Sequence, residues 1–208
     1  MTAVAFSPDG ETLATGGSDG TARQWYVAPP RRKGEPFFSN NRLESVAFSP
    51  DGKILAMAGD EGTVRFWNTH SLKRFEAGRS QGAVLPLSGP VLAVAFSPDG
   101  KTLATAGADG TARLWDAKAT ATHLQIGAPL PAGPGRVTDV AFSPDGEILA
   151  TTDSDGKITL WNVSLPRELV RPVCSIAEYP ISRRQWSTYI RGVPFQQVCR
   201  AAHGPSSN

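Results

Sequence analysis

One short pattern of apolar and polar residues occurs four times along the chain. An apolar tripeptide, Val-Ala-Phe, is followed each time by the turn sequence Ser-Pro-Asp-Gly. The complete heptapeptide is unchanged at residues 4–10, 46–52, 94–100 and 140–146. Proline presets the φ angle that a tight turn needs, and glycine supplies a positive φ. Each copy therefore predicts a short strand that ends in a turn.

Two further strands are predicted after each heptapeptide. Small and apolar residues alternate in a first segment, at 12–16, 54–58, 102–106 and 148–152. A turn made of an acidic residue and glycine follows, and Asp-Gly between alternating segments favours a β-hairpin. The next segment ends on a tryptophan, 19 residues after the phenylalanine of the heptapeptide. These tryptophans are Trp25, Trp67, Trp115 and Trp161.

Each unit also has room for a fourth strand between its tryptophan and the next heptapeptide. The candidate segments lie near residues 35–38, 84–87 and 124–129. Consecutive phenylalanines of the repeat are 42, 48 and 46 residues apart. Four antiparallel strands in about 40–45 residues form one blade of a β-propeller. The pattern therefore predicts an all-β chain with four blades.

The repeat resembles the WD40-repeat family over about residues 3–163. The Trp-Asp pair that ends the third strand in that family is present here as Trp115-Asp116. The resemblance implies a β-propeller in which a tryptophan, a threonine or serine, an acidic residue and a histidine form a hydrogen-bonded tetrad. The matching positions, which we interpret as structural, are Thr15, Asp19, Trp25, Glu61, Trp67, Thr105, Asp109, Trp115, Thr151, Asp155 and Trp161.

The tetrad positions depart from the family pattern in two ways. Met57 stands where the other units have threonine. The sequence contains no Gly-His pair, and the residues nearest to the histidine position are Ser39, Leu87 and Gly133. We therefore expect a weaker hydrogen-bond network in each blade than the family pattern implies.

The domain boundaries follow from the repeat and from its end. Residues 1–165 are predicted to hold the four blades. With their outer strands, the repeats span about 3–38, 43–88, 91–130 and 137–173. A short α-helical extension is expected over 166–200, and a disordered tail over 201–208. The extension is similar to the Cys- and Trp-containing C-terminal region of bacterial WD40 proteins that carry a signalling domain before the propeller.

Four blades are fewer than the roughly seven with which WD40 propellers close. Three interpretations remain: the chain is part of a longer propeller, two copies complete an eight-bladed ring, or the tail covers an open arc. We favour a partial propeller. Unpaired strand edges and apolar blade faces would then meet water. The 208-residue chain is therefore expected to self-associate or to be marginally stable.

Charge and targeting signals narrow the expected partners. Lysine and arginine number 21 and aspartate and glutamate 19, which gives a formal net charge of +2. This near-balance favours neither nucleic acid nor a membrane as a partner. No signal peptide or membrane-spanning segment is recognised, so a cytoplasmic location is expected. The most basic run, residues 29–33, is expected in a solvated connecting loop.

The sequence offers little for catalysis or metal binding. Cys174 and Cys199 either form a disulfide or pack as reduced thiols, and a cytoplasmic protein favours the thiols. Neither the His-Glu-x-x-His pattern of metalloproteases nor the Gly-x-Ser-x-Gly pattern of serine hydrolases is present. We expect no enzyme activity and no metal or cofactor.

Binding of another protein is the leading functional hypothesis, because a stiff frame with variable loops suits recognition. In a family-like setting, this non-enzymatic scaffold would be the sensing or recruiting part of a bacterial signalling system. The alternatives are a propeller remnant without independent activity, or small-ligand binding in the central channel. The partner face is expected on the loops that differ between blades, at Ser18, Ser39, Asn40, Arg42, Asp60 and Arg136.

Overall fold

The computed structural model describes residues 1–39, 41–69, 85–87, 89–117, 125–164 and 171–172. All regular structure in these ranges is β-strand, so the predicted all-β class is confirmed. None of the described residues forms a helix that could span a membrane. Within the predicted helical extension, Arg171–Pro172 form a strand instead of helix, and the rest of the extension, the C-terminal tail, Asn40 and both cysteines lie outside the described residues.

The strands form four antiparallel sheets of four strands each, which we call blades 1 to 4. Blade 1 contains β1 (Ala3–Phe6), β2 (Thr12–Gly16), β3 (Thr21–Tyr26) and β4 (Arg31–Phe38). Blade 2 contains β5 (Leu43–Phe48), β6 (Ile54–Gly59), β7 (Thr63–Asn68) and β8 (Leu85–Pro86). Blade 3 contains β9 (Val91–Phe96), β10 (Thr102–Gly107), β11 (Thr111–Asp116) and β12 (Gln125–Pro131). Blade 4 contains β13 (Val137–Phe142), β14 (Ile148–Asp153), β15 (Ile158–Asn162) and β16 (Arg171–Pro172).

Within each blade the strands follow one another in chain order, and the register of the first three strands is the same in all four. The conserved tryptophan of the third strand is paired with a leucine of the second strand in every blade, as for Leu13 and Trp25. The repeat in sequence is therefore a repeat in side-chain position. A residue of one blade can be compared directly with its equivalent in the next.

One detail of blade 1 differs from the sequence prediction. Arg31, Arg32 and Lys33 do not lie in a connecting loop but begin β4, where they pair with the end of β3. The guanidinium carbon of Arg31 lies 4.6 Å from the centre of the Tyr26 ring, and Lys33 Nζ lies 5.3 Å from it. Attraction between these cations and the aromatic face favours the extended pairing over a solvated loop.

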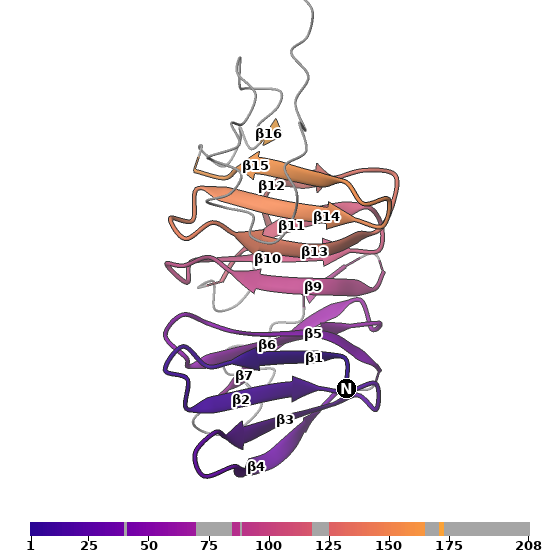
Figure 1. Cartoon of the computed structure of the whole chain (residues 1–208). Coiled ribbons are helices and arrows are strands. Elements are labelled where there is room, and N and C mark those ends of the chain that lie inside the picture. Colours follow the sequence, from indigo (N-terminus) through magenta and orange to yellow (C-terminus); the bar gives the residue numbers. More distant parts are fainter. Residues whose placement is uncertain (40, 70–84, 88, 118–124, 165–170, 173–208) are drawn as a thin grey trace, which may run out of the picture.

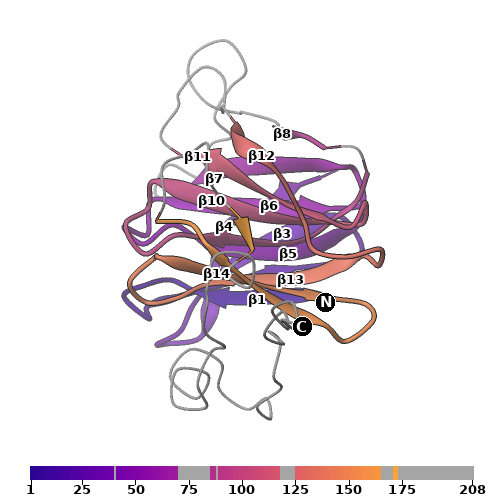
Figure 2. The same ribbon diagram turned by 90° about the horizontal axis from the view of Figure 1, so that it is seen from above.

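The four blades lie side by side in chain order and form an arc (Figure 1). The first strand of each blade contacts the first strand of the next, in the order β1, β5, β9 and β13. Figure 2 shows the blades from above, stacked behind one another. The extensive contacts between described strands join successive blades, and none joins blade 1 to blade 4.

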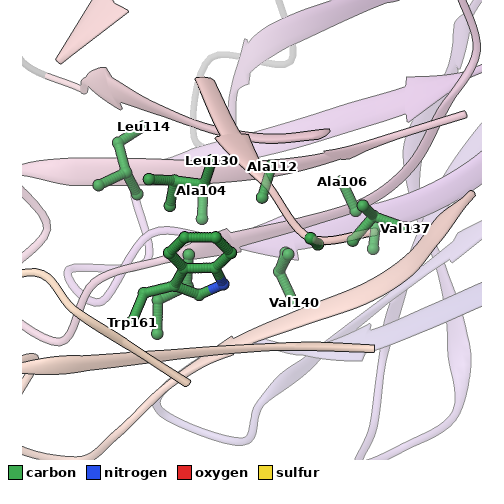
Figure 3. Close-up of a cluster of buried hydrophobic side chains, with 11 residues drawn as sticks. Ala104, Ala106, Ala112, Leu114, Leu130, Val137, Val140 and Trp161 are labelled. Atoms are coloured by element: carbon green, nitrogen blue, oxygen red, sulfur yellow. The ribbon is translucent and has the colours of Figure 1, made fainter. Parts of the chain in front are cut away.

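Three apolar clusters hold the blades together, one at each junction. We call the side of a blade that faces the preceding blade its leading face, and the side that faces the next blade its trailing face. At the junction of blades 3 and 4, Trp161 and Val140 of the leading face meet small residues of the trailing face (Figure 3). These small residues include Ala104, Ala106 and Ala112. Leu114 and Leu130 of the trailing face belong to the same cluster, and burial of these apolar side chains stabilises the junction.

The four Ser-Pro-Asp-Gly turns have one shared hydrogen-bond pattern. The serine hydroxyl donates to the aspartate carboxylate over 2.5–2.7 Å and accepts a backbone N–H of the second strand over 2.9–3.0 Å. The glycine of each turn has a φ between 70° and 76° in blades 1, 2 and 4 and of 67° in blade 3, which favours glycine over residues with a side chain. These turns form a uniform face at one end of the blades.

Candidate functional site

The opposite end of the blades carries loops that differ in sequence, and we call it the loop face. It is formed by the turns between the second and third strands and by the connections that lead from one blade to the next. Backbone hydrogen bonds join the connections to the turns. Ser39 N donates to Gly20 O at 2.7 Å, and Ala132 N donates to Gly110 O at 3.2 Å. The loop face is therefore held in place by backbone hydrogen bonds.

Inside three of the blades, the tryptophan is bonded to the threonine ten residues before it. Trp25 Nε1 donates to Thr15 Oγ1, and the equivalent pairs are Trp115 with Thr105 and Trp161 with Thr151. The donor–acceptor distance is 3.0 Å in all three. The bonds join the second and third strands within the blade, so their role in this structure is to support the frame beneath the loop face.

Blade 2 lacks this bond. Met57 occupies the threonine position and is buried, and Trp67 Nε1 has no hydrogen-bond partner in the part of the chain that the structure describes. Trp67 packs instead against Phe37 of blade 1, with ring centres 4.7 Å apart. Aromatic packing between blades thus takes the place of a hydrogen bond within the blade.

The acidic tetrad residues are paired with arginines that the sequence analysis did not single out. Asp109 accepts a hydrogen bond from Arg113 Nη2 at 2.8 Å, and Glu61 from Arg65 Nη2 at 2.6 Å. Asp19 lies 3.5 Å from Arg23. An acidic residue four positions before an arginine recurs in three of the units, and this spacing was a signal for the pairs.

The charge pairs change the acidity of these carboxyl groups. The hydrogen bond from Arg65 holds the pKa of Glu61 below its usual value. Burial acts to raise the pKa of Asp109, but the hydrogen bonds from Arg113 and Thr111 outweigh it and lower the pKa. The hydrogen bond from the Thr21 hydroxyl lowers the pKa of Asp19. All three groups are therefore carboxylates at neutral pH and do not act as proton donors.

Blade 4 uses a different carboxylate. Asp155, at the tetrad position, is exposed, whereas Asp153 is buried. Asp153 Oδ1 accepts the backbone N–H groups of Asp155 and Lys157 at 3.0 and 2.9 Å. A Cβ atom on Gly133, the residue at the histidine position, would lie 2.7 Å from the Asp153 carboxylate. Asp153 thus occupies the space beside the position of the missing histidine.

The residues predicted for the partner face are distributed along the loop face. Ser18, Arg42, Asp60 and Arg136 are exposed. Ser39 is half-buried, and its hydroxyl donates to Glu61 Oε2 over 3.4 Å, so it links the blade 1 connection to blade 2. The four exposed residues come from different blades and connections, and Asp60 N donates to Arg42 O at 3.1 Å, which joins two of them through the backbone. They form a broad surface rather than a compact site.

Two observations bear on small ligands. Within the described ranges, histidine, cysteine and acidic side chains form no cluster that could hold a metal ion. An apolar pocket of about 410 Å³ is present on the leading face of blade 1, lined by residues that include Phe6, Leu13, Trp25 and Val27. These residues lie at or beside the ends of β1, β2 and β3 nearest the Ser-Pro-Asp-Gly turn, so the pocket is away from the loop face.

Comparison with known proteins agrees with this architecture. Residues 1–26, 37–68, 82–116 and 128–162 match the sequence profile of the WD40 family, described as "WD domain, G-beta repeat". A chain of the "Crystal Structure of Mitotic Checkpoint Complex" is similar with a TM-score of 0.67 and 26% sequence identity. The match covers 78% of this chain and 48% of that one. No curated protein sequence matches the chain.

Each matched segment covers the first three strands of one blade and ends one residue after the repeat tryptophan. The second to fourth segments also include residues of the preceding blade's outer strand. The chain spans about half the length of the solved chain that it matches. The predicted resemblance is therefore confirmed by sequence, by blade structure and by similarity to a solved fold: the chain belongs to the WD40-repeat family.

Proposed function

We propose that this chain is a non-enzymatic scaffold that binds another protein through its loop face. WD40 domains typically act as interaction modules rather than catalysts, which supports the general role. The observation that carries the proposal is the contrast between the two ends of the blades. Four identical, hydrogen-bonded turns form one end, and exposed loops of different sequence are held on a firm frame at the other.

The chemistry of the loop face favours a polar protein surface as its partner. Arg42 and Arg136 are exposed cations, and Asp60 is an exposed carboxylate in the same set of loops. Arg42 is oriented by an ion pair of 2.8 Å with Glu44, so its side chain is partly preorganised. Mixed charges on an ordered surface steer and orient a partner of complementary charge.

The cellular setting is the finer part of the proposal. We infer a role as the sensing or recruiting part of a bacterial signalling system in the cytoplasm. This inference is supported by the similarity of the C-terminal region to that of bacterial WD40 proteins with signalling domains. We also infer that copies of the chain associate with each other to complete a ring.

Affinity capture with matched variants tests the binding proposal. The triple variant Arg42→Ala, Asp60→Ala and Arg136→Ala removes side chains of the loop face. The matched control, Lys53→Ala with Lys101→Ala, removes exposed side chains of the opposite face. A partner retained by the wild type and the control but lost by the triple variant supports the proposal. A partner that is lost only by the control refutes the proposal. Capture of no partner at all also refutes it, and favours a propeller remnant without independent activity.

A further inference from the structure

The leading face of blade 1 has the same residues as the other leading faces but is uncovered. Val46, Val94 and Val140 are only 5–7% exposed, because each is covered by the preceding blade. Val4, their equivalent in blade 1, is 64% exposed, and Phe6 beside it is also 64% exposed. The large side chains that join blades elsewhere in this chain therefore meet water in blade 1.

The apolar pocket lies in this uncovered face. Its lining includes Trp25 and Leu13, whereas the equivalent residues Trp161 and Leu149 are buried between blades 3 and 4. In that junction the space is filled by residues of a trailing face, which include Ala104, Leu114 and Leu130 (Figure 3). The pocket of about 410 Å³ is thus the space that a trailing face fills at the three internal junctions.

In the part of the chain that the structure describes, the Ser-Pro-Asp-Gly turn of blade 1, at the edge of this face, also lacks the contact that the equivalent turns make with a preceding blade. A Cβ atom on Gly146 would lie 3.4 Å from Pro98 of blade 3, and a Cβ atom on Gly100 would lie 3.4 Å from Pro50 of blade 2. A Cβ atom on Gly10 of blade 1 would meet nothing within 4 Å. The equivalent glycines of blades 3 and 4 contact the turn proline of the preceding blade, and Gly10 has no such contact among the described residues.

The complementary surface is present at the other end of the same chain. Ala104 and Ala106 on the trailing face of blade 3 are completely buried, whereas Ala150 and Thr152 at the same positions of blade 4 are half-buried. A Cβ atom on Gly156 would meet nothing within 4 Å among the described residues. Leu160 on the same face is 5% exposed, so the trailing face of blade 4 is accessible only in part, at Ala150 and Thr152.

We propose that the leading face of blade 1 binds the trailing face of blade 4 of a second copy of this chain. The contact continues the interface that already occurs at three junctions within the chain, where the leading face of one blade packs on the trailing face of the blade before it. Two copies related by a two-fold axis form this contact twice and close an eight-bladed ring. This inference deepens the self-association part of the proposed function and rests on it.

The solved chain of similar fold gives an independent indication of size. The match covers 78% of this chain and 48% of that one, so the matched parts of two copies together are about as long as that single chain. Apolar area at the two new junctions would be removed from water as it is at the internal ones. Closure also removes the exposed edge faces that favour aggregation.

The molecular mass in solution tests the proposal. The full 208-residue chain is measured by light scattering after size-exclusion chromatography and by analytical ultracentrifugation over a range of concentrations. The expected species has twice the chain mass of 22.1 kDa. A monomer at all concentrations, or a series of growing oligomers, would overturn the closed pair.

Two variants locate the contact. Phe6→Asp places a charge on the leading face, and Ile158→Asp places one near the trailing face of blade 4. Each variant alone blocks both contacts of the ring and should weaken dimerisation on the order of a hundredfold or more. Ala128→Asp adds the same charge on the outer strand of blade 3, at an exposed position between the two ends, and should leave the dimer intact.

Mixing the variants distinguishes a head-to-tail contact from a contact between like faces. The Phe6→Asp copy keeps a usable trailing face and the Ile158→Asp copy keeps a usable leading face. Their mixture should form a heterodimer through one contact, whereas neither variant associates alone. If Ile158→Asp still dimerises while Phe6→Asp does not, two leading faces meet and the proposal is wrong.

Folding and partner binding are monitored separately. Circular dichroism verifies each variant, and the milder Phe6→Ser and Ile158→Ser replace any variant that unfolds. In the wild type, amide hydrogen exchange in β1 and β15 should slow as concentration rises, and unchanged exchange would contradict the contact. The loop-face triple variant should keep the dimer mass. If no dimer is found, the proposal that the loop face binds a partner is unaffected. If no partner is captured, the proposal that two copies form a ring is unaffected.

Discussion

Replacement of Gln24 by leucine should stabilise the protein. Gln24 is 1% exposed, and among the described residues neither its amide nitrogen nor its amide oxygen has a hydrogen-bond partner. The equivalent residues of the next three blades are Phe66, Leu114 and Leu160, and all of them are buried. Blade 1 therefore buries an amide group at a position that the other blades fill with an apolar side chain.

The magnitude follows from the cost of an unsatisfied buried amide. Mutational data place this cost at about 1–3 kcal/mol, and leucine has nearly the same volume as glutamine. Gln24→Leu should therefore raise the free energy of unfolding by about 1–3 kcal/mol. For a chain of this size, each kcal/mol corresponds to a rise in melting temperature of about 2–4 °C.

Urea unfolding followed by tryptophan fluorescence measures the change. The matched control is the reverse substitution at the equivalent position of blade 3, Leu114→Gln, which buries a new amide in an apolar cluster. This control should lower the free energy of unfolding by at least about 2 kcal/mol. A Gln24→Leu variant that unfolds at the same or a lower urea concentration than the wild type would refute the reasoning.

Three further predictions concern the tetrads and the turns. Thr105→Val should destabilise the chain by about 1–3 kcal/mol in urea unfolding, because Trp115 Nε1 loses its acceptor, while Thr105→Ser should cost less. Arg65→Gln should lower the melting temperature more than Arg23→Gln, because the Arg65 side chain is 14% exposed and that of Arg23 37%; equal shifts would contradict this. Hydrogen bonds from serine hold the pKa of each of the four turn aspartates below its ordinary value. These carboxylates therefore stabilise the fold above about pH 4, and unfolding measured from pH 7 to pH 2 should show stability falling as they are protonated.

The sequence was sufficient for the fold because the repeat sets both strand length and register. The heptapeptide and the tryptophan fix two points in every blade, and the leucine paired with Trp25 follows from the spacing. Arg31 to Lys33 were misplaced for a physical reason. Proline and a run of like charges indicate a loop, but the ring of Tyr26 attracts the cations and extends β4.

The details of the loop face were less predictable. The arginine pairs of Asp109 and Glu61 could be found from their spacing of four residues, once the turn geometry was known. The role of Asp153 could not be predicted from the sequence. It depends on the fact that Asp153, and not Asp155, is buried beside Gly133. The unsatisfied amide of Gln24 also depends on packing between blades, which a single strand pattern does not contain.

Hydrogen exchange of the chain with and without a captured partner tests the scaffold role most directly. The binding account predicts slower exchange in the loop face, in the turns 17–20 and 59–62 and in the connection 132–136. Exchange in the uniform turns 7–10 and 49–52 should stay unchanged on partner binding. Protection confined to those uniform turns, with the loop face unaffected, would contradict the account.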